Sequence, residues 1–169
     1  MEIIRELRRF TSPFPQPQAL YVDGPTLWMT SRLTRRLYAV DLASGRVTWE
    51  TAVPGTATGW GITMKGGDLY VVCGTDATGI DDRVIRRCVP GQGFDPAFSW
   101  ACPEGMGSHL SFTGESLVLS QWYPRKLVYF DPAGRVANSP LRTGSAAIAS
   151  RPAPSGSRPP TRRRPTNTS

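Results

Sequence analysis

Histidine and cysteine are scarce in this chain of 169 residues. It has one histidine, His109, and three cysteines, Cys73, Cys88 and Cys102, with no Cys-x-x-Cys pair. Structural zinc sites take four such ligands at paired spacings, so these residues give no support for a zinc module. An odd number of cysteines without a secretory leader predicts reduced, buried thiols and a cytoplasmic location.

Long apolar runs are also absent. No segment approaches the ~18 consecutive apolar residues of a membrane-spanning helix, so we expect no membrane partner. Residues 1–17 alternate acidic and basic side chains around Ile3, Ile4, Leu7 and Phe10. This pattern predicts an N-terminal extension that contains a short amphipathic helix.

Acidic residues are missing from the C-terminal part of the chain. The net charge is +7, and the stretch from Ala137 onward holds six arginines but no lysine, aspartate or glutamate. Leu141 and Ile148 are the only large apolar residues in that stretch. Such a composition cannot form a core, so residues 139–169 are predicted to be a disordered Arg/Pro/Ser-rich tail. We expect nucleic-acid binding only as a non-specific property of this tail.

Helical periodicity is absent between Gln18 and Asn138, where a repeat of short strands is present instead. Leu27, Leu69 and Leu117 each follow a glycine by three positions and an apolar residue by seven. These leucines are 42 and 48 residues apart. That spacing is typical of propeller blades and too long for leucine-rich or ankyrin repeats.

Each copy of the repeat contains four apolar segments separated by turn residues, which predicts four-stranded antiparallel sheets. The turn between the third and fourth strands occurs as "VDLASGRV" and again as "FDPAGRV". In these turns we expect Asp41 and Asp131 to accept backbone N–H bonds, and Gly45 and Gly134 to adopt positive φ.

The repeated segments resemble the β-propeller superfamily. "LYAVDLASGRVTWE" resembles blades of quinoprotein-type and YVTN-type propellers, and "TGWGITMKGGDLYVV" is similar to virginiamycin B lyase-like and senescence-marker/gluconolactonase-like propellers. The resemblance implies an all-β fold, a partial propeller over residues 18–138 with blades at about 18–54, 59–103 and 107–138. Propellers close with about four to eight blades, so three blades indicate a fragment of a longer propeller.

The resemblance also implies where a site would lie, because propellers bind ligands at the mouth of the central channel. Trp60 and His109 occupy the matching positions, in the segments that lead into the innermost strands. His109 could serve as a base or ligand, and it could equally be hydrogen-bonded in the channel wall. No G-x-S-x-G elbow accompanies it, so a Ser/His/Asp triad has no support in the sequence.

A second candidate is the cluster "SQWYPRK" at the end of a predicted strand. Gln121, Trp122 and Tyr123 could stack on and hydrogen-bond a planar or sugar-like ligand. Packing of Trp122 between blades is the alternative, with Arg125 and Lys126 solvated.

No set of catalytic side chains converges in the sequence, which favours a non-catalytic module that binds an unknown small molecule or protein and needs no cofactor. The alternative that the resemblance implies is a metal-dependent lyase or lactonase with a divalent cation at the channel and His109 as the base. Two three-bladed chains could also pair as a homodimer that closes a six-bladed ring.

Overall fold

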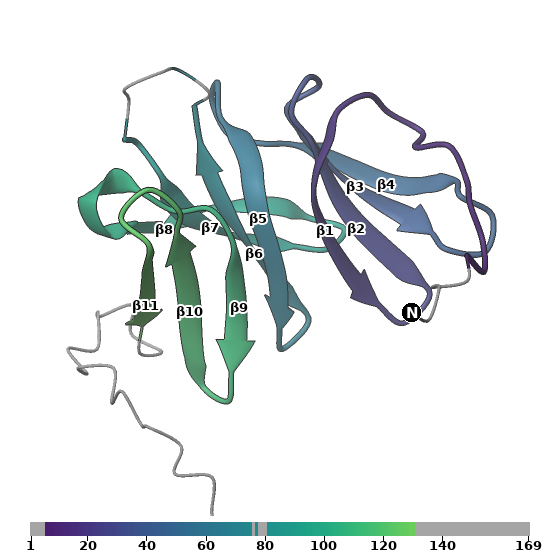
Figure 1. Ribbon diagram of the computed structural model, residues 1–169. Helices are drawn as coiled ribbons and strands as arrows, with labels where there is room; N and C mark the ends of the chain where they lie inside the picture. The colour runs from purple at the N-terminus through teal and green to yellow at the C-terminus, as the bar shows by residue number, and fades with distance from the viewer. Residues whose placement is uncertain (1–5, 76, 78–80, 131–169) are drawn as a thin grey trace, which may run out of the picture. The chain divides into compact units, whose positions relative to one another are not determined.

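Three antiparallel β-sheets make up the part of the chain that the computed structural model describes, which is residues 6–75, 77 and 81–130 (Figure 1). The first sheet holds β1 (Pro17–Asp23), β2 (Thr26–Ser31), β3 (Arg36–Asp41) and β4 (Val47–Ala52). The second holds β5 (Thr58–Lys65), β6 (Asp68–Gly74), β7 (Val84–Val89) and β8 (Gly93–Ala101). The third holds β9 (Leu110–Thr113), β10 (Ser116–Gln121) and β11 (Lys126–Phe130). Consecutive strands are neighbours in every sheet, which confirms the predicted all-β fold of repeated sheets.

Glycines form the turn between the first and second strands of each sheet, as the repeat predicts. Gly24, Gly66 and Gly114 lie in these three turns, with φ of +53°, +61° and +58°. A side chain at such φ values clashes with the following carbonyl, which glycine avoids. The three copies therefore share one turn chemistry.

The turn between β3 and β4 also has the predicted chemistry. The Asp41 carboxylate accepts the Ser44 N–H at 2.7 Å and the Ser44 hydroxyl at 2.6 Å, and Gly45 has a φ of +70°. The corresponding Asp131 and Gly134 lie outside the described residues.

The middle sheet packs against both of its neighbours through side chains that alternate along its strands. Val71 and Cys73 on β6 join a core shared with the first sheet, where Trp28 and Leu37 are buried. Val72, on the opposite face of β6, joins a second core shared with the third sheet. Burial of both faces explains why "LYVVC" reads as a continuous apolar run.

The first strands of the three sheets lie side by side, because β1 contacts β5 and β5 contacts β9. Their close approach depends on glycine. A Cβ atom at Gly59 would come within 2.6 Å of Thr30 Cγ2, and one at Gly61 within 2.6 Å of the Ser108 carbonyl oxygen. The Thr30 hydroxyl also donates a 2.8 Å hydrogen bond to the Gly59 carbonyl, which ties β2 to β5.

The N-terminal helix prediction is wrong for its described part, because residues 6–16 contain no helix. Phe14 instead stacks on Tyr38 of β3, with ring centroids 3.9 Å apart, and the Arg8 guanidinium donates to the Leu42 and Ala43 carbonyls. Prolines also remove backbone donors from this segment. Figure 1 shows the segment, in purple, running along the first sheet on the side away from the second.

Strand β8 is an edge strand of the second sheet. It starts at Gly93 and includes Pro96, which an edge strand tolerates because its outward N–H has no ladder partner. The predicted fourth strand of the third copy and the tail at residues 139–169 lie outside the described residues.

The three cysteines are buried and free, as predicted. Burial away from water raises the pKa of Cys73, Cys88 and Cys102 to about 12, so these thiols are protonated at neutral pH. Among the described residues, no helix is long and apolar enough to cross a membrane.

Candidate functional site

The candidate site residues predicted from the sequence, Trp60, His109, Gln121, Trp122 and Tyr123, lie at one end of the sheets. Because each sheet is an antiparallel meander, the β2–β3 and β10–β11 turns share this end with the segments that lead into β1, β5 and β9. Trp60 lies near the start of β5, His109 immediately precedes β9, and Gln121 to Tyr123 begin the β10–β11 turn.

His109 is exposed, and its hydrogen bonds in the described structure are made by its backbone. Its N–H donates to Ser120 Oγ at 3.2 Å, and its carbonyl accepts the Ser120 N–H at 2.8 Å. Among the described residues, no group of three or more His, Cys, Asp or Glu side chains is placed to hold a metal ion. A role for the His109 ring as base or ligand stays a prediction.

Trp60 is half-buried and held between cationic side chains. Its indole N–H donates to the Gly74 carbonyl at 3.1 Å. The Arg83 guanidinium lies 3.8 Å from the centroid of its ring and the Arg32 guanidinium 5.9 Å. Cation–π attraction thus fixes the indole and orients two arginines at this end of the sheets.

The cluster around Trp122 divides into a buried anchor and an exposed aromatic pair. Gln121 is only 2% exposed, and its amide nitrogen donates to the carbonyls of Pro103 and Met106 at 2.7 and 3.0 Å. Trp122 and Tyr123 are 77% and 85% exposed, and their rings stack with centroids 5.7 Å apart. Trp122 therefore does not pack between the sheets of this chain, contrary to one of the two alternatives.

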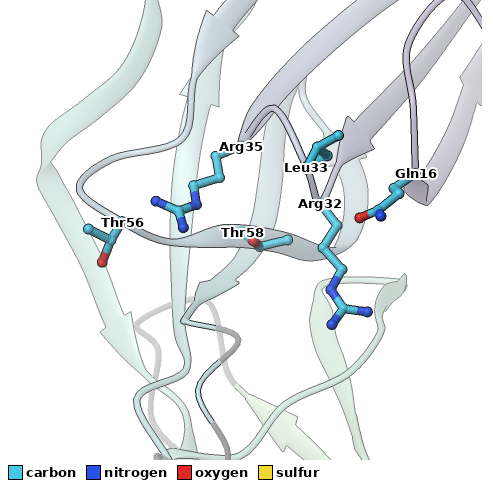
Figure 2. Close-up of a pocket in the computed structure, with 6 residues that line it drawn as sticks. All are labelled: Gln16, Arg32, Leu33, Arg35, Thr56 and Thr58. Atoms are coloured by element: carbon cyan, nitrogen blue, oxygen red, sulfur yellow. The ribbon is translucent and has the colours of Figure 1, made fainter.

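A pocket of about 300 Å³, which the sequence analysis missed, opens at the junction of the first and second sheets. Figure 2 shows the side chains of Arg32 and Arg35 on either side of Thr58. The residues that line it come from three separate loops and the start of β5: Gln16, Arg32, Leu33, Arg35, Thr56 and Thr58.

Hydrogen bonds between loops hold the walls of this pocket. The Arg32 N–H donates to the Gln16 carbonyl at 3.0 Å, and the buried Ser31 hydroxyl donates to the Pro15 carbonyl at 2.6 Å. Arg35, at a φ of +52°, accepts the Val53 N–H through its carbonyl at 2.9 Å. The β2–β3 turn is thus fixed both to the segment before β1 and to the segment after β4.

One signal in the sequence could have indicated this basic end. Arg35, Arg83 and Arg125 each stand immediately before the third strand of their sheet. A residue-by-residue comparison of the three copies reveals this recurrence, whereas the pocket itself depends on loops that only the fold brings together.

The comparisons with known proteins give matches among solved structures only. No protein-family model and no curated protein match this chain. The structure of a streptogramin B lyase superposes with a TM-score of 0.58 at 18% identity, over 83% of this chain and 46% of that one. The Cps50 (Swd1) β-propeller domain of Myceliophteria thermophila superposes with a TM-score of 0.51 at 17% identity, over 72% of this chain and 39% of that one. This chain has the β-propeller fold.

A further match is the hydrazine synthase of Kuenenia stuttgartiensis, with a TM-score of 0.51 at 16% identity, over 79% of this chain and 38% of that one. This chain therefore spans less than half the length of each of these three structures. At identities this low the likeness shows the fold alone.

The propeller fold identifies the three sheets as blades and β1, β5 and β9 as their innermost strands. The aromatic pair, Trp60 and the pocket all lie at the end of the blades where loops lead into these strands. This end offers two different surfaces, a protruding aromatic pair on the third blade and a concave basic pocket between the first and second blades.

Proposed function

We propose that this propeller chain is a non-catalytic interaction module that binds a partner protein through Trp122 and Tyr123. The observation that carries the proposal is the exposure of two large stacked aromatic rings on a turn that is anchored from below. Tryptophan and tyrosine are the residues most enriched at the energetic centres of protein interfaces.

The shape of this surface favours a protein over a small molecule. A small ligand is usually held in a concave site that buries most of its surface. Trp122 and Tyr123 are not among the residues that line the pocket between the first and second blades, and most of their surface is in solvent. A partner with its own apolar recess could instead enclose the two rings.

The turn that carries the rings is rigid, which lowers the entropy cost of binding. Gln121 fixes its start through two hydrogen bonds, and the Arg125 N–H donates to the Trp122 carbonyl at 3.1 Å. Lys126 closes its other end through a 2.9 Å ion pair with Glu104. With Arg125 beside the rings, the expected partner surface is apolar with an acidic rim.

The proposal includes a cytoplasmic location and a longer propeller of which these blades form a part. Three buried, free thiols support a reducing compartment. Leu127 on the third blade is 52% exposed. An exposed leucine on this blade is consistent with a further blade that would pack against it. Translation of the neighbouring DNA in the other reading frames tests the longer propeller. Finding no further blade-like repeat there would contradict it.

The test is to capture partners with the chain, purify the protein retained, and measure its dissociation constant. Replacing both rings in Trp122→Ala/Tyr123→Ala should weaken binding at least tenfold, since hot-spot truncations cost about 2 kcal/mol or more. Leu20→Ala removes a 60% exposed side chain from β1 and serves as the control that should bind normally. Equal affinities of the partner for the unaltered chain, the double variant and Leu20→Ala would refute the proposal.

A further inference from the structure

The pocket between the first and second blades is lined mainly by hydrogen-bond donors. Two guanidinium groups, two threonine hydroxyls and one carboxamide surround it, with Leu33 as the apolar wall. No carboxylate is among its lining residues. Within residues 6–75, 77 and 81–130, no carboxylate lies within ion-pair distance of the Arg35 guanidinium either.

We infer that this pocket is a binding site for a small oxyanion, a carboxylate or a phosphate, held by Arg35. A guanidinium presents a planar fork of N–H donors that matches two oxygens of either anion. The hydroxyls of Thr56 and Thr58 and the amide of Gln16 add donors around the same space.

The size of the pocket limits the ligand. At ~30 Å³ for each water-sized group, a volume of about 300 Å³ holds roughly ten such groups. That is room for a small organic acid or a phosphate ester. It lies at the lower limit of typical ligand pockets.

The site is built before any ligand arrives. Thr58 is 2% exposed at the floor of the pocket, and the loops that carry Gln16 and Arg32 are joined by a backbone hydrogen bond of 3.0 Å. Two of the lining residues, Gln16 and Arg35, have positive φ values of 46° and 52°. Left-handed backbone at a residue other than glycine costs free energy and often accompanies a functional site. This inference does not depend on the Trp122–Tyr123 surface.

The experiment is a calorimetric titration of the full chain with two probes, inorganic phosphate and malonate, at constant ionic strength. We expect saturable binding of at least one probe, and the probe that binds distinguishes a phosphate ligand from a carboxylate one. Arg35→Gln should weaken that binding at least tenfold. Arg46→Gln removes the same charge from the exposed β3–β4 turn at the opposite end of β3, and it should change the affinity less than twofold.

The arginines of residues 137–169 are present in every variant, so a difference between variants isolates the pocket. Thr56→Val, at an exposed wall position, gives a second reading should Arg35→Gln fail to fold, and it should weaken binding at least threefold. Absence of saturable binding for both probes would overturn the inference. Equal affinities for Arg35→Gln and Arg46→Gln, or an unchanged affinity for Thr56→Val, would also overturn it.

Discussion

Gln121 shows how a single polar residue organises the candidate surface. Its buried amide joins the end of β10 to the short 3₁₀ helix η1 (Pro103–Gly105) and to Met106 through two hydrogen bonds. The next two side chains, Trp122 and Tyr123, are in solvent. Adjacent positions therefore differ in role: one is buried and supports the turn, and two are exposed at the proposed binding surface.

This difference leads to a stability prediction. Gln121→Ala should lower the free energy of unfolding by about 1–3 kcal/mol, because the part-buried carbonyls of Pro103 and Met106 each lose a donor. Trp122→Ala should change it by less than about 0.5 kcal/mol, as exposed substitutions usually do. Urea unfolding of both variants measures the two values. A larger loss for Trp122→Ala than for Gln121→Ala would show that the indole, and not the amide, holds the turn.

Sequence reasoning located these residues but could not assign their roles. Glutamine, tryptophan and tyrosine in "SQWY" look equally suited to a ligand, because burial depends on residues 103–106, which are distant in the sequence. The stacking of Phe14 on Tyr38 is hidden for the same reason, because these residues are distant in the sequence. The charge pattern before Phe14 predicts a helix that the described part of the segment does not form. Turn chemistry was predictable at Asp41 and Gly45, since neighbours within the turn determine it.

At the scale of elements, the inner strands explain why the blades can pack closely. Glycine at two positions of β5 lets this strand approach β2 on one side and the segment before β9 on the other. Strand alternation and repeat spacing predicted the order of the sheets. The glycine contacts between blades could not be predicted, because the sequence does not show which strands face each other.

Gly61→Ala should therefore destabilise the protein by about 1–3 kcal/mol, because a new Cβ would overlap the Ser108 carbonyl oxygen, which is backbone and cannot rotate away. Gly66→Ala is the comparison, since its Cβ would meet open space and its cost arises only from a φ of +61°. Unfolding in guanidinium chloride measures the free energy of unfolding of both variants. A smaller cost for Gly61→Ala than for Gly66→Ala would contradict the packing of β5 against the third blade.

At the scale of the whole molecule, the first blade is covered by the chain itself. Residues 6–16 contribute Phe14 to a cluster with Leu27, Met29 and Tyr38, on the face opposite the second blade. That face is where a further blade, or a second copy closing a ring, would pack. Ring closure between two chains thus requires these residues to leave the first blade.

In this architecture the three blades and residues 6–16 pack as one unit of a single chain. Light scattering of the full chain at two concentrations tests it directly. We expect a mass of 18.5 kDa at both concentrations, and a mass that rises with concentration for Phe14→Ala, which uncovers part of the first blade. A dimer of the unaltered chain at both concentrations would contradict it, because a second copy would then cover the face assigned to residues 6–16.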